Sequence, residues 1–162
     1  MHFWDKTKRN HGLEHATITL LLGDMAPAKP MAGYSIPTGF FVLGDVTTDE
    51  VRAKADQALD RMKRGEAELA VSPFCGTNIV VSAGLTTMAA LAGYGLGGRG
   101  LRGINRAFSN VVFALVASRP IGRYIQSRYT TSGDVASMHI HGITRFNLGK
   151  FNAHWVSTRF AD

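Results

Sequence analysis

The centre of the chain is apolar and uncharged. Residues 76–98 read GTNIVVSAGLTTMAALAGYGLGG and contain no charged side chain. As a helix rising about 1.5 Å per residue, this stretch would cover the hydrocarbon core of a bilayer. A second apolar run, 107–118, reaches a spanning length only if it continues through Pro120 to about Tyr124. The pattern predicts two antiparallel apolar helices within residues 77–128, joined by the turn GLGGRGLRGINR.

Small residues and arginines define the character of this predicted hairpin. Gly, Ala, Ser and Thr let helices approach closely in lipid, although they make the first run only mildly hydrophobic. We expect the hairpin to be embedded in a membrane, and a hairpin buried inside a soluble domain is the alternative. Basic residues on both sides leave its orientation open. Five arginines at its turn and its end suit acidic lipid headgroups or an acidic partner: Arg99, Arg102, Arg106, Arg119 and Arg123.

Before the hairpin, residues 9–75 show the patterns of a small α+β unit. Residues 40–43 form a short apolar strand. A helix should begin after Thr47, because Thr47 and Glu50 have the spacing of a capping box and apolar residues then recur at helical intervals. Residues 66–71, EAELAV, alternate as a half-buried strand does. Strand, helix and strand in this order would allow a βαβ unit with a right-handed crossover.

After the hairpin, residues 130–160 favour a β-hairpin. The runs 137–146 and 151–160 flank the turn-like NLGK. Their strands could complete the sheet begun in the first half of the chain. We therefore expect one α+β domain over residues 1–162, with a small mixed sheet, amphipathic helices and an inserted apolar hairpin.

A short motif near the start of the chain carries candidate chemistry. In HGLEH, His11 and His15 are four residues apart and would share one face of a helix, where two imidazoles can bind one ion. Glu14 could be the general base for a bound water. Over these five residues the motif is similar to the HxxEH motif of the inverzincin metallopeptidases. Their downstream glutamate ligand has no counterpart here, because no acidic residue lies between Glu68 and Asp134, so the similarity implies a metal site and no peptidase activity.

Further ligands can be proposed from two other motifs. In MHIHG, His139 and His141 would point to the same face of a strand and could complete a zinc site. Four protein ligands would make the zinc structural, whereas three would leave a position for water. Cys75 is the alternative, as a thiolate ligand or a nucleophile. With Thr77 and Asn78 it could also hold an anion at a helix start, although helix capping is the simpler role.

Composition and charge narrow the class of partner. The formal net charge is +6 and the sequence pI is about 9.8, which suits an anionic partner. A single cysteine excludes an internal disulfide. Phosphate-loop and dinucleotide-binding fingerprints are missing, and we expect no specific nucleic-acid partner, because the arginines flank apolar helices without a recognisable reading motif.

Four motifs together resemble a known family. RNHGLEHAT, GFFVLGDV, CGTN and TTSGD are similar to an uncharacterised family of bacterial proteins, a domain of unknown function, over most of residues 9–145. The resemblance implies membrane association, at the bacterial cytoplasmic membrane, and brings no activity with it. It draws attention to eleven residues: His11, Glu14, His15, Cys75, Gly76, Thr77, Asn78, Thr131, Ser132, Gly133 and Asp134.

Two functions of different classes follow, and whether the protein is an enzyme stays open. The favoured one is a non-catalytic scaffold or assembly protein whose hairpin packs against a membrane-protein partner or a second copy, with acidic lipid at its basic flanks. The alternative is a membrane-anchored zinc-type metalloprotein or metallohydrolase that uses the HGLEH helix, with Asp134 or Cys75 nearby. A tetrapyrrole metal ranks third, because neither apolar run contains a histidine.

Overall fold

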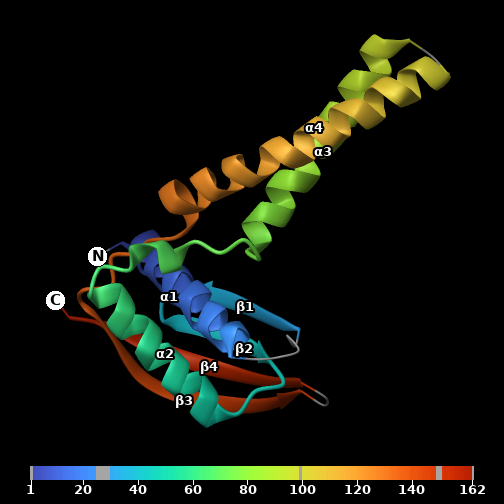
Figure 1. Ribbon diagram of the computed structural model, residues 1–162. Helices are drawn as coiled ribbons and strands as arrows, with labels where there is room; N and C mark the ends of the chain where they lie inside the picture. Colours follow the sequence, from blue (N-terminus) through green and yellow to red (C-terminus); the bar gives the residue numbers. More distant parts are fainter. Residues whose placement is uncertain (1, 25–29, 99, 149–150, 162) are drawn as a thin grey trace. The chain divides into compact units, whose positions relative to one another are not determined.

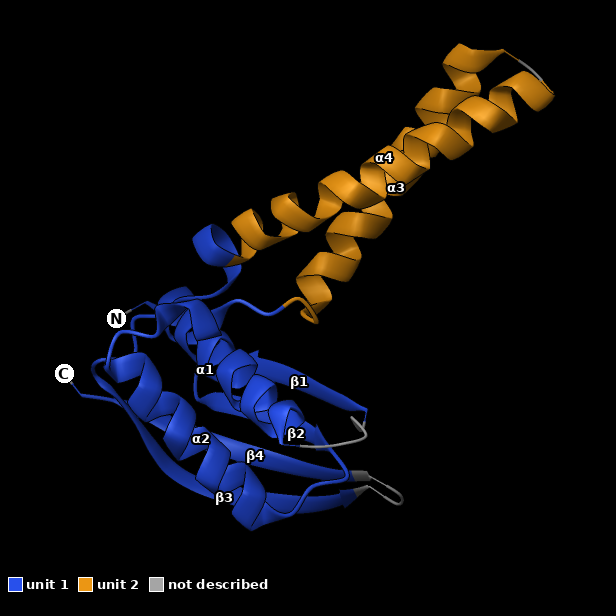
Figure 2. Ribbon diagram, viewed as in Figure 1, with its two compact units in different colours: residues 1–72, 127–162 blue, residues 73–126 orange. Residues whose placement is uncertain are grey.

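The computed structural model describes residues 2–24, 30–98, 100–148 and 151–161. The chain forms two compact units, which are described one at a time (Figure 1, Figure 2). Unit 1 contains residues 1–72 and 127–162, and unit 2 contains residues 73–126.

Unit 1 is built on a four-stranded antiparallel sheet. Its strand order is β1 (Met31–Ile36), β2 (Gly39–Gly44), β4 (Phe151–Phe160) and β3 (Met138–Leu148). All three neighbouring pairs are antiparallel. The α+β class is therefore confirmed, as are strands close to 40–43, 137–146 and 151–160, whereas the parallel βαβ unit is wrong.

Two helices cover the sheet of unit 1. The helix α1 (Phe3–Gly23) contacts β1 and β2, and α2 (Thr48–Lys63) contacts β3 (Figure 1). The predicted capping box of α2 is formed: the Thr47 hydroxyl accepts from the Glu50 amide, and the Glu50 carboxylate accepts from the Thr47 amide. The core is apolar and lies between the helices and the sheet. Its most buried members include Leu13, Phe40, Val42, Val51, Met138 and Val156.

The predicted strand at 66–71 is wrong, because Ala67–Ala70 forms a short 3-10 helix, η1. The chain reverses direction just before it, at Gly65, whose φ is +104°. The Arg61 guanidinium then binds the Glu66 carboxylate, with 2.8 Å between Nε and Oε2. Alanine and glutamate also have low strand propensity, so their alternation carries little weight without a neighbouring strand to pair with.

Unit 2 is a hairpin of two antiparallel helices, α3 (Gly76–Gly97) and α4 (Leu101–Ile125). The hydroxyls of Ser82 and Ser118 lie 2.8 Å apart across the pair. Nearer the turn, a Cβ on Gly93 would lie 2.6 Å from the Cα of Ala107. Small residues thus let the two backbones approach closely, as the sequence predicts, and the large apolar side chains point outward.

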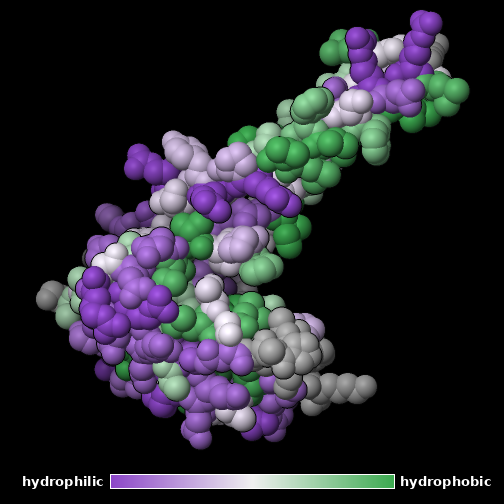
Figure 3. Space-filling model, in the orientation of Figure 1, coloured by the Kyte–Doolittle hydropathy of each residue, from purple (hydrophilic) through white to green (hydrophobic). Residues whose placement is uncertain are grey.

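The surface of unit 2 is unusually apolar. Along the middle of the hairpin hydrophobic residues cover the surface, and hydrophilic ones gather near the turn (Figure 3). Within the described residues, α3 is the one helix that is long and apolar enough to cross a membrane, and it could be membrane-embedded. The helix α4 contains four arginines along its length, and they make it less apolar than a membrane-crossing helix of this kind.

Candidate metal centre

His11 and His15 lie on one face of α1, one turn apart. Their ring centroids are 4.3 Å apart and the ring planes are inclined by 60°. His15 is buried, with 4% of its surface exposed, and His11 is half-buried. The predicted i, i+4 arrangement of the two imidazoles is therefore present.

The residue before His11 has a structural role. Asn10 lies seven residues inside α1, which begins at Phe3, and it is fully buried. Its amide donates to the carbonyl of Ile36 at 2.8 Å and its oxygen accepts from the Thr158 hydroxyl at 2.7 Å. Asn10 thus connects α1 to the sheet, which is a structural role.

Each histidine is oriented by a backbone carbonyl. The Nδ1 atom of His11 lies 2.8 Å from the oxygen of Thr130, and the Nδ1 atom of His15 lies 2.8 Å from the oxygen of Ala70. A carbonyl oxygen only accepts, so both Nδ1 atoms must donate a proton. In the neutral imidazole the lone pair is then on Nε2. Both rings therefore have the tautomer in which Nε2 can bind a metal.

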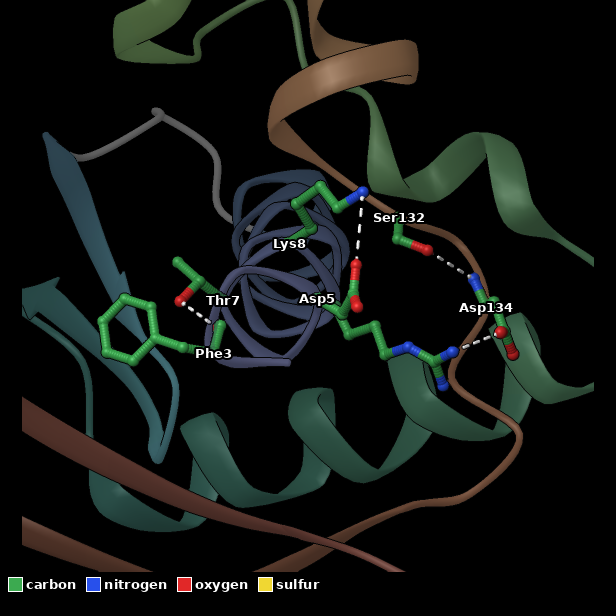
Figure 4. A network of polar contacts seen from close by, with 7 residues as sticks. Phe3, Asp5, Thr7, Lys8, Ser132 and Asp134 are labelled. Atoms are coloured by element: carbon green, nitrogen blue, oxygen red, sulfur yellow. Dashed lines mark hydrogen bonds and ion pairs between the residues drawn. The ribbon is translucent and has the colours of Figure 1, made fainter. Parts of the chain in front are cut away.

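The carbonyl that orients His11 belongs to the TTSGD segment, residues 130–134, which packs across α1. The amide of Ser132 donates to the Lys8 carbonyl at 3.0 Å. The Arg9 guanidinium binds the Asp134 carboxylate at 2.6 Å, and the Asp134 amide donates to the Ser132 hydroxyl (Figure 4). Gly12 permits this approach, because a Cβ there would lie 2.3 Å from the Ser132 oxygen. Asp134 therefore pairs with an arginine of unit 1.

Glu14 has a different environment from the histidines. It is buried, and its carboxylate accepts a hydrogen bond from the Ser35 hydroxyl of β1. The carboxylate also lies over Gly33, where a Cβ would be 2.1 Å from Oε1. These contacts direct Glu14 toward the sheet and give it a positioning role there. Its action as a general base stays a prediction.

Cys75 lies at the N-cap of α3 in unit 2 and is buried. Its Sγ accepts from the Thr77 amide at 3.4 Å. The Asn78 side chain donates to the Pro73 carbonyl and accepts from Gln126, so CGTN organises the beginning of the helix. Cys75 therefore belongs to unit 2, whereas His11 and His15 belong to unit 1.

The second histidine pair has a different environment from the first. His139 and His141 are both exposed on β3. A β-bulge separates Ile140 from Gly142, so His141 is the extra residue and has no paired position on β4. A bulge disrupts the strict alternation on which the shared-face argument depends. The structure therefore does not bring His139 and His141 to the α1 pair.

The five predicted lipid-binding arginines have partly described positions. Arg99 lies outside the described residues. Arg102, Arg106, Arg119 and Arg123 are all exposed on α4, and Arg106 donates to the carbonyl of Leu96 at 3.2 Å. They stand in two pairs, one near the turn of the hairpin and one toward the end of α4.

One polar residue that the sequence interpretation missed is His154. It is completely buried on β4, and neither ring nitrogen has a hydrogen-bond partner. Burial, with a smaller contribution from the positive charge of Arg145, lowers the pKa of His154. Its immediate neighbours in the strand, Ala153 and Trp155, are apolar. This apolar setting was the only sequence signal of its burial, and it is too common in strands to single out one histidine.

The fold and the site define a small α+β protein that carries an apolar helical hairpin and a pair of histidines that could bind a metal ion. The chain belongs to the family described as "Domain of unknown function (DUF6391)", which matches residues 6–143. It is 37% identical over 95 residues to an uncharacterized protein of Picosynechococcus sp.. That alignment covers 53% of this chain and 45% of the relative, so the chain spans less than half of the relative's length. No solved structure matches the chain.

Proposed function

We propose that this protein binds a transition-metal ion through His11 and His15, with zinc as the ion that the ligand types favour. The two Nδ1 hydrogen bonds to backbone carbonyls support the proposal most strongly. Histidines that bind metals almost always donate their other ring N–H to a carbonyl or carboxylate, which fixes the tautomer and the ring orientation. Here both histidines meet this condition on one face of one helix.

The third ligand in this proposal is Cys75, because it follows Ala70, whose carbonyl binds His15, by five residues along the chain. Metals bind the thiolate form of cysteine, and the N-terminus of a helix, where Cys75 lies, favours that form. Zinc with two imidazoles and one thiolate keeps a fourth position for water, which is the pattern of catalytic rather than structural sites. A zinc ion there would supply Lewis-acid activation of that water.

Metal analysis of the detergent-purified, untagged protein tests the site. We expect a stoichiometric metal that is lost in His11→Ala/His15→Ala and retained in His139→Ala/His141→Ala, which removes two exposed histidines from the same unit. Substitution by Co²⁺ then tests Cys75, because a thiolate ligand adds a charge-transfer absorption that Cys75→Ser would remove. Metal-free wild-type protein would overturn the proposal.

We further propose that unit 2 anchors the protein in the bacterial cytoplasmic membrane. The 22 residues of α3 contain no charged side chain and extend over about 33 Å, close to the thickness of a bilayer core. Large apolar side chains on both helices are exposed, far beyond the isolated patches of ordinary soluble surfaces. They include Ile79, Val80, Met88, Leu91, Phe108, Phe113 and Val116.

Flotation with liposomes tests the anchor. The wild-type protein should float with the vesicles and require detergent for extraction. Met88→Arg/Leu91→Arg, which places two charges within α3, should shift the protein to the soluble or aggregated fraction, whereas Tyr34→Arg on the exposed surface of β1 should float normally. Recovery of the wild-type protein in solution without detergent would contradict the anchor.

A non-catalytic scaffold role is the second candidate. One observation favours it: Arg119 and Arg123 are exposed four residues apart on α4, where like charges repel and an acidic group of a partner membrane protein would stabilise both. In this role the protein would co-purify with a larger complex. Arg119→Ala/Arg123→Ala should then reduce the size of that complex while the protein still floats. An unchanged size would exclude this role for the two arginines.

A further inference from the structure

The first turn of α1 exposes two large aromatic side chains among basic residues. Phe3 is 72% exposed and Trp4 is 55% exposed. Phe3 lies on the opposite side of α1 from Ser132 (Figure 4). Trp4 stands four residues before Lys8, so these two share one face of the helix. Adjacent exposed apolar side chains with polar neighbours are typical of surfaces that contact a protein or a membrane.

A third exposed aromatic lies close to this turn. Tyr129, 60% exposed, belongs to the π-helical turn η2 (Gln126–Thr130), which comes directly after α4. This turn and the residues that follow it are hydrogen-bonded to α1. The His11 ring binds the Thr130 carbonyl, and the Ser132 amide donates to the Lys8 carbonyl. The first half of α1 and the segment that leaves the hairpin therefore form one end of unit 1.

Covalent connections limit how far this end can be from the hairpin. The helix α4 ends at Ile125, and Ser132 follows seven residues later. Because an extended chain covers at most about 3.6 Å per residue, Ser132 and the α1 backbone bonded to it lie within about 25 Å of the end of α4. On the other side, the Ala70 carbonyl bonded to His15 precedes the start of α3 at Gly76 by six residues. If the hairpin is in a bilayer, this end of unit 1 is held near the headgroups.

Charge at this end complements an anionic surface. Within residues 3–9 and 126–134, four basic side chains stand against two acidic ones, Asp5 and Asp134, which leaves a surplus of two positive charges in these two segments. Both acidic groups are already paired, with Lys8 and Arg9. Basic side chains close to a membrane gain free energy from anionic lipids, and Trp and Tyr prefer the bilayer interface. The basic residues are Lys6, Lys8, Arg9 and Arg128.

We propose that this end of unit 1 is a second membrane contact, which inserts Trp4 and Phe3 into the headgroup region of an anionic lipid bilayer. The proposal rests on the hairpin anchor and adds a surface that orients unit 1 against the membrane. Trp4 supplies an aromatic ring with a polar N–H, Phe3 supplies apolar area, and Tyr129 lies at the same end. The adjacent basic side chains select anionic over zwitterionic lipid.

Quenching of Trp4 by brominated lipid tests the contact. The chain has two tryptophans, and Trp155 lies on β4 against Phe41, with ring centroids 4.7 Å apart. The protein is reconstituted in vesicles of phosphatidylcholine and phosphatidylglycerol that contain lipid brominated near the headgroup. The difference between wild-type protein and Trp4→Phe isolates the emission of Trp4 without altering Trp155. We expect Trp4 to be quenched and Trp155 to keep its emission.

Three results would overturn the proposal. Trp4 could emit fully in protein that floats with the vesicles, which would refute the contact and leave the hairpin anchor intact. Quenching could be equal for Trp4 and Trp155, which would mean no oriented contact. Quenching could also be independent of the phosphatidylglycerol content and of salt, which would refute the choice of anionic lipid, because surface electrostatics weaken as salt rises. Loss of flotation in the wild-type protein would instead refute the anchor.

Discussion

Replacing Gly12 by alanine should destabilise unit 1, although alanine is the better helix former. A Cβ at this position would lie 2.3 Å from the backbone oxygen of Ser132 and 3.1 Å from the Cβ of Ala70. A backbone oxygen cannot rotate aside as the end of a long side chain can. The TTSGD segment would therefore have to move away from α1, together with the Thr130 carbonyl that orients His11.

The size of this effect follows from three contributions. Overpacking costs about 1–3 kcal/mol, and loss of the hydrogen bond from the Ser132 amide to the Lys8 carbonyl costs about 1 kcal/mol. The better helix propensity of alanine offsets about 1 kcal/mol. We expect the free energy of unfolding to fall by about 2 kcal/mol, which lowers the Tm of a chain of this length by about 4–8 °C.

Thermal melting followed by circular dichroism in detergent measures the change. Gly23→Ala is the matched control, because Gly23 lies on the same helix and an added Cβ has nothing within 4 Å. Its Tm should stay equal to that of the wild type or rise slightly. A Gly12→Ala protein that melts with the wild type would refute the close approach of the TTSGD segment to α1. Weaker metal binding by Gly12→Ala is expected as well, since the His11 ring would lose its orienting carbonyl.

Substitutions at three other residues test their environments in unit 1. Burial holds the pKa of His154 below its ordinary value of 6.5. As the pH drops below 6.5, the unfolded chain binds a proton at His154 before the folded protein does, so the free energy of unfolding falls. His154→Leu should flatten this pH dependence in denaturation curves measured across that range. Glu14→Ala should cost about 1–3 kcal/mol, because the Ser35 hydroxyl loses its acceptor, whereas Glu14→Gln should keep most of the stability. Equal stability of the two Glu14 variants would contradict the positioning role. Thr47→Ala should lower the free energy of unfolding by about 1 kcal/mol through loss of the capping box, and an unchanged denaturation midpoint would contradict it.

Elements with strong local signals could be predicted from the sequence. The helix α2 follows its capping box, and its apolar positions Val51, Ala55, Ala58, Leu59 and Met62 are all buried. The helices α3 and α4 follow from long apolar runs between glycines. These signals act within a few residues of one another, so they require no knowledge of the rest of the fold.

Elements that depend on distant partners could not be predicted. The strand β1 contains Gly33 and has no fully buried residue, so its sequence lacks the usual signals of a strand. It forms because it pairs with β2 and because Gly33 leaves space for the buried Glu14 carboxylate. The antiparallel order likewise depends on β4 entering the sheet between β2 and β3, a long-range contact that no local pattern specifies.

The candidate site was likewise predictable where local spacing determines it and unpredictable where it depends on distant residues. The i, i+4 spacing of His11 and His15 was enough to place both imidazoles on one face. The groups that orient them are main-chain carbonyls of residues 70 and 130, and a carbonyl has no signature in the amino-acid sequence. The pattern of His139 and His141 misled because a bulge of one residue changes which side chains share a face.

The two orienting carbonyls also connect the site to the hairpin along the chain. Ala70 lies six residues before α3 begins and Thr130 lies five residues after α4 ends. The chain therefore enters and leaves the hairpin through the two segments that His11 and His15 bind. Pulling either segment away leaves a half-buried (His11) or buried (His15) imidazole N–H without its acceptor, at a cost of up to about 1–3 kcal/mol. Because an ion bound at Nε2 requires the same Nδ1 tautomer, metal binding and attachment of these segments must stabilise each other.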